Sequence, residues 1–219
     1  MRYTIRSMKD EDILQAIEID YEAFPTQWPH PTYSSFKHEL RNRLAQYIVV
    51  AREQEMEPEA ASGQRGNRSF WEGVLELKHL LDHDRFFGEE KPSPSKEHVV
   101  GIAGFWTMAD EAHVTTIAVR DAYRRQGLGE WLLISIIDMA IQINSTLVTL
   151  EVRVSNGDAQ ALYEKYGFRR AGMRRGYYTD NGEDGLIMST DGLNSPIFLS
   201  YFEKLKQIHR RRWTELYLV

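Results

Sequence analysis

The chain has 219 residues, of which 42% are hydrophobic and 27% charged, and its formal net charge is −5. This composition predicts a globular protein that buries a sizeable core, and it argues against nonspecific nucleic-acid binding, which requires a basic surface. The chain has no cysteine, which excludes disulfides, thiolate zinc sites and a cysteine nucleophile.

The first fifty residues predict a strand, two helices and a second strand. Residues 2–6 alternate as a short strand does, and residues 9–22 carry apolar residues at helical spacing behind an acidic first turn. A proline-rich loop at 24–31 leads into a second amphipathic helix whose apolar stripe ends at Leu44. Residues 47–51 then form an apolar run that predicts a buried strand.

Residues 53–97 interrupt this regular pattern. They are polar and rich in glycine, serine and proline, except for a strongly apolar helix-like stretch at about 69–83. We expect an insertion that carries one helix, packed over the substrate entrance or against a second copy of the protein. His79 and His83 lie one helical turn apart and could share a metal, but no third ligand is evident and we expect none.

The pattern resumes after the insertion. It predicts two antiparallel strands, a buried helix, a strand, a helix and two further strands: residues 99–106, 114–119, 129–142, 146–153, 157–166, 168–177 and 184–189. Residues 195–212 predict a last amphipathic helix, whose apolar residues are Ile197, Phe198, Tyr201, Phe202 and Leu205. The order predicts an α/β domain with a mixed central sheet at residues 1–192, with 53–97 inserted, followed by a helical extension at 193–219.

A glycine-containing turn joins a predicted strand to the buried helix. Residues 124–129 read Arg-Arg-Gln-Gly-Leu-Gly. Glycines there let backbone N–H groups approach a phosphate, and the helix dipole and the arginines favour an anion. The pattern lacks the third glycine of a dinucleotide fingerprint and the lysine of a P-loop. A helix start that only requires small residues is the alternative.

The motif and its neighbours together resemble the GNAT superfamily, in its RimI branch of ribosomal-protein-alanine N-acetyltransferases. Five segments carry the resemblance in order and spacing: residues 116–119, 123–129, 150–156, 159–168 and 175–188. The similarity extends over residues 2–51 and 98–189. It implies a GNAT-type mixed sheet flanked by helices and an acetyl-CoA-dependent N-acetyltransferase. The insertion and the tail depart from the compact family pattern.

The resemblance also implies which residues contact acetyl-CoA. Backbone groups of the strand at 117–119 would bind the pantetheine arm, and the turn would surround the pyrophosphate. Asn156 and Tyr163, later in the chain, would lie against the thiol. These residues are Ile117, Ala118, Val119, Arg124, Arg125, Gln126, Gly127, Leu128, Gly129, Glu130, Asn156 and Tyr163.

Glu151 is the candidate general base. Polar and apolar residues alternate along its strand, which places Glu151 on the face opposite Val148 and Leu150, and the resemblance implies a base at this glutamate. An α-amine with a pKa of about 7.7–8.0 is roughly a tenth neutral at pH 7, so it asks little of the base. The alternative is a structural carboxylate paired with Arg153 or Arg169.

Tyr163 is the candidate acid for the leaving thiol. A phenol of pKa about 10 facing a thiolate of about 8.5 would transfer its proton uphill by about 2 kcal/mol, so a hydrogen bond can suffice. The alternative is a core aromatic.

Aromatic residues in two loops are candidates for the walls of a peptide-binding channel: Phe24, Pro25, Trp28, Tyr177 and Tyr178. Rigid aromatics bind an extended peptide at little entropic cost, although each could equally pack within the core.

We therefore expect acetyl transfer to a protein N-terminus, plausibly a ribosomal protein alanine. The other hypotheses are an acetyltransferase for a small amine, such as an aminoglycoside or a polyamine, and an acyl-CoA-binding module without turnover. The presence of both Glu151 and Tyr163 argues against the last. The N-terminus lacks a signal-peptide pattern and no 18-residue apolar run occurs, so we expect a cytoplasmic protein without membrane or nucleic-acid partners. A homodimer through the insertion or the tail helix is a further expectation.

Overall fold

The computed structural model describes residues 2–27, 29–52 and 97–217, with side chains of the last helix described to Trp213. One seven-stranded sheet runs in the order β1-β2-β3-β4-β5-β7-β6. The strands are β1 Tyr3–Ser7, β2 Ala45–Arg52, β3 His98–Met108, β4 Glu111–Val119, β5 Leu147–Arg153, β6 Phe168–Tyr178 and β7 Glu183–Thr190.

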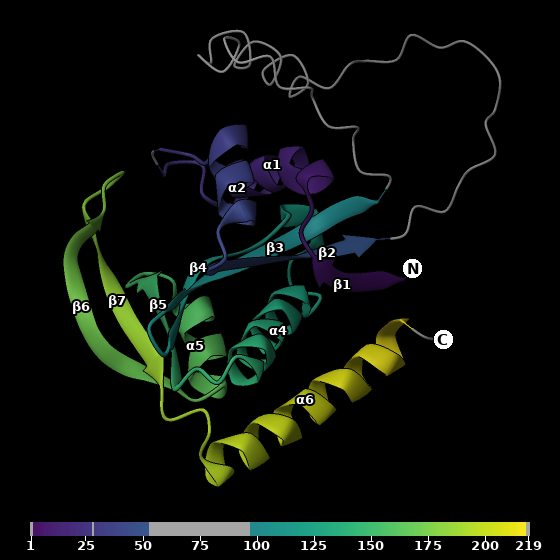
Figure 1. Cartoon of the computed structure of the whole chain (residues 1–219), viewed down its shortest axis with the longest axis vertical. Helices are drawn as coiled ribbons and strands as arrows, with labels where there is room; N and C mark the ends of the chain where they lie inside the picture. The colour runs from purple at the N-terminus through teal and green to yellow at the C-terminus, as the bar shows by residue number, and fades with distance from the viewer. Residues whose placement is uncertain (1, 28, 53–96, 218–219) are drawn as a thin grey trace, which may run out of the picture.

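Helices cover both faces of this sheet. They are α1 Ile13–Ala23, α2 Tyr33–Arg41, α4 Leu128–Gln142, α5 Gly157–Lys165 and α6 Pro196–Tyr217, with short 3-10 helices at Asp10–Asp12 and Asp121–Tyr123. Figure 1 shows α1 and α2 on one side, and α4, α5 and α6 on the other. In the described parts of the chain, no helix is long and apolar enough to span a bilayer.

The sheet divides between β4 and β5, its only parallel pair among the described residues. Their register runs from Glu111 opposite Leu147 to His113 opposite Thr149 and then stops. Beyond this point β4 continues to Val119 and β5 to Arg153, but the two strands are no longer paired with each other. An opening in the sheet results, with strand edges whose backbone groups are available to a ligand.

Two hydrophobic clusters fix the helices to the two faces. On one face α1 and α2 enclose buried residues that include Ile13, Ile19 and Phe36. On the other face α4 is buried on several sides, as its apolar sequence predicts, and α6 adds Phe198, Phe202 and Leu205 to the same cluster. The tail helix therefore belongs to the core of this chain.

The order of elements predicted from the sequence is confirmed, with two corrections of detail. Helix α2 ends at Arg41 because Asn42 turns to extended backbone angles, so Leu44 lies outside it and is 59% exposed. Ile197, predicted on the apolar stripe of the tail, is 84% exposed at the start of α6. The predicted insertion, with His79 and His83, lies outside the described residues. The division into a domain at 1–192 and an extension at 193–219 stays a prediction.

Candidate active site

The glycine turn leads into the first turn of α4, where Leu128 is buried and Gly127, Gly129 and Glu130 are partly exposed. Arg125 and Gly127 both take left-handed backbone angles, with φ of 63° and 86°. Gly127 is the N-cap of α4, and no side chain in the described chain caps this helix end. The first N–H groups of a helix have no partner within the helix, and the positive end of the helix dipole lies there. The turn is therefore suited to bind an anion such as a phosphate.

The two glycines of the turn are required for different reasons. A Cβ on Gly127 would lie 3.3 Å from Nε1 of Trp213 in α6, and the backbone there is already left-handed. A Cβ on Gly129 would meet only Val119, at an ordinary 3.9 Å. Packing within the chain thus explains Gly127. Gly129 leaves open a space that a ligand at the helix end can use, so the turn fits a phosphate-bearing cofactor.

The two arginines of the turn differ in how firmly they are held. The guanidinium of Arg124 donates to the carbonyl oxygen of Val119 at 3.2 Å and pairs with Asp121 at 2.7 Å. Arg125 pairs with Asp158 at 2.8 Å, but both side chains are more than four-fifths exposed. An exposed ion pair contributes little, so Arg125 is free to exchange Asp158 for a phosphate.

The other polar side chains of the turn contact the protein. Gln126 accepts a hydrogen bond from the hydroxyl of Tyr3 at 3.2 Å. Glu130 accepts hydrogen bonds from Lys165 and Tyr166, both at 2.6 Å. Burial alone would raise the pKa of Glu130, but these two donors outweigh it and lower the pKa. Gln126 and Glu130 are thus left with their backbone N–H groups as the means of contacting a phosphate.

A β-bulge in β4 redirects the strand next to the opening. Gly104 pairs with Thr116 and Phe105 with Val114, which leaves Thr115 as an extra residue. Before the bulge Val114 packs on the α4 side, whereas after it Ala118 packs on the α1 side. Bulges often occur next to active sites because they change the direction of side chains.

The predicted pantetheine contacts lie just after this bulge. Ile117, Ala118 and Val119 pair with β3 on one edge of β4, and on the other edge the described β5 ladder has already ended. Their position at the opening agrees with the expected backbone contacts, which stay a prediction.

Glu151 lies on the α1–α2 face of the sheet and is held at both carboxylate oxygens. Its side chain is 5% exposed; Oε2 lies 3.1 Å from Nε2 of His113, and Oε1 lies 3.0 Å from the Arg174 guanidinium. The alternation predicted for β5 is confirmed, because Val148, Leu150 and Val152 are buried in the opposite cluster. The structural alternative named Arg153 or Arg169 as the partner of Glu151, and these partners are wrong. Arg153 pairs with Asp180 and Glu183, Arg169 pairs with Asp191, and the arginine at Glu151 is Arg174. The catalytic role of Glu151 stays a prediction.

The tyrosine pair of β6 lies against this charged group. Arg174 lies 5.4 Å from the centroid of the Tyr177 ring, and Arg153 lies 3.9 Å from that of Tyr178. Burial, and then the charge of Glu151, raise the pKa of Tyr177. Gly185 of β7 makes room for this ring, since a Cβ there would lie 2.9 Å from it.

The two loops predicted to form the peptide channel meet each other. Phe24 ends α1, and two residues later the hydroxyl of Thr26 donates to Asp180 in the β6–β7 turn. Asp180 also binds Arg153 at 2.9 Å. The segments of Phe24 and Pro25 and of Tyr177 and Tyr178 are thus joined across the site, and Trp28 lies outside the described residues.

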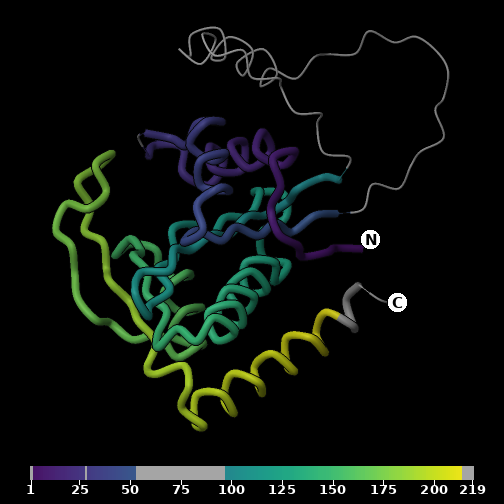
Figure 2. Tube along the Cα trace, in the orientation of Figure 1, coloured from purple at the N-terminus to yellow at the C-terminus, as the bar shows by residue number. Residues whose placement is uncertain are grey.

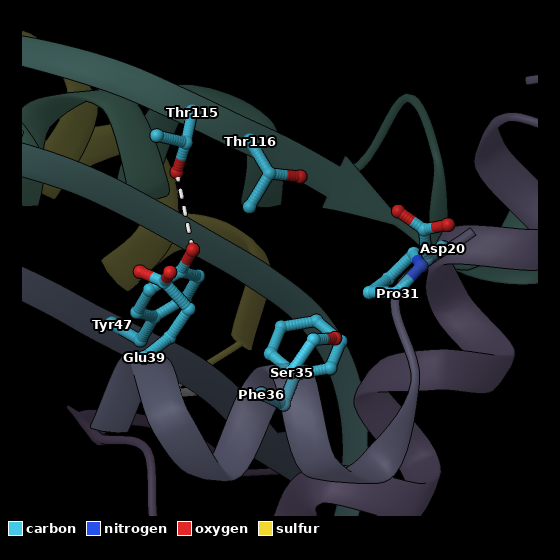
Figure 3. A pocket seen from close by; sticks show the side chains of 8 residues that line it. All are labelled: Asp20, Pro31, Ser35, Phe36, Glu39, Tyr47, Thr115 and Thr116. Carbon is cyan, nitrogen blue, oxygen red and sulfur yellow. Dashed lines mark hydrogen bonds between the residues drawn. The ribbon is translucent and has the colours of Figure 1, made fainter. Parts of the chain in front are cut away.

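A cavity of about 150 Å³ opens between α1, α2 and β4 on the same face as Glu151 (Figure 3). It is lined by Asp20, Pro31, Ser35, Phe36, Glu39, Tyr47, Thr115 and Thr116. Tyr47 and Thr115 approach each other at 3.4 Å, and the hydroxyl oxygen of Thr116 is buried with no hydrogen-bond partner in the described chain. Thr115 follows His113 by two residues, so β4 contributes both to the cavity and to the Glu151 group.

Comparisons with known proteins agree with this geometry. Residues 52–168 match the acetyltransferase (GNAT) family. A Bacillus subtilis relative, named provisionally as a ribosomal protein bS18-alanine N-acetyltransferase, is 34% identical over 185 residues, which are 84% of this chain and 92% of that protein.

The chain belongs to the GNAT family of acetyltransferases.

Other relatives of this GNAT chain fit the same assignment. The Escherichia coli ribosomal protein bS18-alanine N-acetyltransferase is 49% identical over 82 residues, 36% of this chain and 55% of that protein. The crystal structure of the Escherichia coli ribosomal-protein-S18-alanine N-acetyltransferase superposes with a TM-score of 0.59 at 27% identity, covering 86% of this chain and 93% of that one. The predicted GNAT-type fold is thus confirmed.

Two remaining GNAT site predictions have clear positions. Tyr163 of α5 packs against Phe168 with ring centroids 5.7 Å apart, and burial raises its pKa to about 12. Burial and then the charge of Tyr177 raise the pKa of Tyr178, Arg153 lowers it, and the charge of Tyr163 adds a smaller increase. Asn156 caps α5, because its side-chain oxygen accepts from the N–H of Ala159 at 3.2 Å. Asn156 therefore already has a structural role as the cap of α5, and a contact with the thiol would be a second role.

His113 and Arg174 were missed by the sequence reasoning. His113 becomes a neighbour of Glu151 only through the parallel register that sets it opposite Thr149. Arg174 reaches Glu151 across β7, at a point where its own register partner is Gly185. The one sequence signal for these neighbours was the alternation of polar and apolar residues, which sets His113 and Glu151 on the polar faces of their strands. In the described part of the chain, no cluster of possible metal ligands was found.

Proposed function

We propose that this GNAT enzyme transfers the acetyl group of acetyl-CoA to the α-amine of a protein N-terminus, with the N-terminal alanine of a ribosomal protein as the foremost substrate. The names of its relatives support the substrate. The observation that carries the proposal is the opening between β4 and β5, with an uncapped helix N-terminus on one side and the buried carboxylate of Glu151 on the other.

The cofactor side of the opening supplies backbone groups. The free edge of β4 at Ile117–Val119 would bind the pantetheine arm, as strands bind an added strand. The N–H groups of Leu128 to Glu130 and the exposed Arg125 would bind the pyrophosphate. Acetyl-CoA, when bound, supplies the thioester whose acetyl group is transferred.

Glu151 is proposed to accept the proton that the amine loses, directly or through a water molecule. In the transfer, the bond between the amine nitrogen and the acetyl carbon forms, and the bond from that carbon to sulfur breaks. An α-amine near pKa 8 is already partly neutral at pH 7, so a carboxylate suffices as its base. His113 and Arg174 fix the orientation of this carboxylate.

Tyr163 is proposed to donate a hydrogen bond to the departing sulfur. With its pKa raised to about 12, full proton transfer to a thiolate of pKa about 8.5 would be uphill by roughly 5 kcal/mol. That is more than twice the cost for an ordinary tyrosine. Hydrogen-bond stabilisation of the thiolate is therefore favoured over complete transfer, with the final proton coming from solvent.

A turnover assay against a substrate panel tests the proposal. Acetyl-CoA would be supplied with peptides of ribosomal protein N-termini, the same peptides with a blocked α-amine, and free amines that include spermidine and an aminoglycoside. Transfer to the free α-amine alone is expected. Transfer only to small amines would overturn the acceptor, and absence of transfer to all of them would overturn the activity.

The cavity beside Thr116 favours a small polyamine as second candidate. Asp20 and Glu39 line it, and carboxylates attract cations. Both are already engaged, Asp20 by His30 at 2.8 Å and Glu39 by the Trp106 indole at 2.6 Å. Their residual charge is smaller than an open acidic entrance would offer, so the peptide stays the first candidate.

A further inference from the structure

The C-terminal helix reaches back to the glycine turn. Figure 2 shows α6 running beneath α4, and its C-terminal part lies on the same side of the molecule as β1. Helix α6 is anchored along its length: Tyr201 donates to the carbonyl oxygen of Lys165 at 2.9 Å, and Lys206 pairs with Asp138 at 2.7 Å. One turn later its side chains arrive at Gly127.

One side chain of α6 contacts the turn directly, and a second packs behind it. Nε2 of His209 lies 3.2 Å from the carbonyl oxygen of Gly127, and Nε1 of Trp213 donates to Nε2 of His209 at 2.8 Å. The Trp213 ring packs against Trp131 of α4 and Tyr3 of β1, with centroids 5.0 and 5.7 Å apart. His209 is only 7% exposed.

One nitrogen of an imidazole carries either a proton or a lone pair, so His209 cannot serve both contacts fully at once. Burial lowers the pKa of His209, which favours the neutral ring. The shorter contact assigns the lone pair of Nε2 to the Trp213 N–H, and the alternative tautomer donates to Gly127. In either state the ring and the indole fill the space behind the turn.

We propose that α6 is part of the cofactor site: His209 and Trp213 are positioning residues that hold the Gly127 turn in the conformation that binds the pyrophosphate of CoA. The inference rests on the proposed use of acetyl-CoA. The left-handed Gly127 is conformationally permissive, and a turn that is ordered before binding does not lose that freedom when the ligand arrives. The carbonyl of Gly127 also accepts the first hydrogen bond of α4, from Trp131 at 3.0 Å, so the contact fixes the helix end.

Calorimetric binding of CoA to the full-length protein tests this without relying on turnover. His209→Ala removes the imidazole behind the turn and should weaken CoA binding by about three- to tenfold, the effect of one lost hydrogen bond. Trp213→Phe removes only the N–H that donates to His209 and should have a smaller effect, because Nε2 of His209 can then carry the proton and donate to Gly127. His209→Gln keeps an N–H that can donate to Gly127 and should restore most of the affinity. Lys206→Gln is the matched control, because it removes an α6 anchor away from the turn, and it should change affinity by less than about twofold.

The KM for the acceptor peptide should stay at the wild-type value in all four variants. Equal CoA affinities for His209→Ala and Lys206→Gln would overturn the proposal and leave α6 as a structural element. That outcome is distinct from failure of the proposed function, in which the wild-type protein itself binds no CoA or transfers no acetyl group.

Hydrogen exchange on the wild-type protein gives a second test if a variant does not fold. By linkage, CoA bound at the turn should slow amide exchange in the last turns of α6 around residues 209–213 as well as in the turn itself. Protection confined to β4 and the start of α4, with α6 unchanged, would contradict the proposal.

Discussion

The two ends of the candidate site are built in different ways. The cofactor end is a contiguous turn at residues 124–130, whose shape depends on the left-handed backbone of Arg125 and Gly127. The acceptor end combines Glu151 of β5 with His113 of β4 and Arg174 of β6. A contiguous turn can be recognised in a sequence as a motif, whereas a group assembled across strands depends on their register.

Because the two ends are built separately, substitutions at one end should have different effects from substitutions at the other. The turn is proposed to bind the cofactor and not the acceptor, so changes there should alter CoA affinity. The Glu151 group lies on the opposite side of the opening, on the face of α1 and α2, so changes there should alter turnover or peptide binding and leave CoA affinity intact. A substitution that crosses this division would show that the two ends are coupled.

The largest effect is expected from Glu151→Gln. Loss of a general base should lower kcat by about 10²–10³-fold with CoA affinity unchanged, because Gln keeps the shape but cannot accept the proton. Steady-state kinetics measures it, and Glu164→Gln on the exposed face of α5 is the control. Raising the pH should restore part of the rate, since more amine becomes neutral. A defect that stays constant with pH would identify Glu151 as a positioning residue.

The two glycines of the turn should separate affinity from stability. Gly127→Val places a side chain against Trp213 in a left-handed backbone, so it should lower the melting temperature as well as weaken CoA binding. Gly129→Ala should weaken CoA binding by about tenfold without loss of stability, because the added methyl group would enter space proposed for the ligand and alanine favours a helix.

Unchanged CoA affinity in Gly129→Ala would show that the phosphate lies elsewhere. Thermal unfolding and calorimetry on both variants distinguish these outcomes.

The sequence predicted the elements and the cofactor motif, because both depend on local patterns. The alternation along β5 set Glu151 on the correct face, and the apolar sequence of α4 predicted its burial. The Arg174 contact could not be predicted, since it crosses β7 and depends on the exact strand order. Contact of His209 with Gly127 was equally hidden, because it joins residues 82 positions apart through the packing of two helices.

A smaller effect is expected from Tyr163→Phe. The loss of one hydrogen bond to the sulfur should reduce kcat by about tenfold, and the ring contact with Phe168 should keep the fold intact. The test is to compare a thioester with a lower thiol pKa, which needs less help at the sulfur. The variant should regain activity with it. An equal defect with both thioesters would remove Tyr163 from the leaving-group step.

The smallest effect is expected where the two loops of the acceptor end meet. Thr26→Val keeps the shape of the side chain and removes the hydroxyl that donates to Asp180. Asp180 would keep its contact with Arg153, so the β6–β7 turn should remain in place while the α1–α2 loop is released from it. Because one hydrogen bond between the two loops is lost, the peptide KM should rise by about two- to tenfold, with kcat and CoA affinity unchanged. Thr32→Val, which removes the N-cap of α2 in the same connection, is the control, and it should lower stability with less effect on the peptide KM. If Thr26→Val instead weakened CoA binding, the two ends would be coupled through the α1–α2 loop.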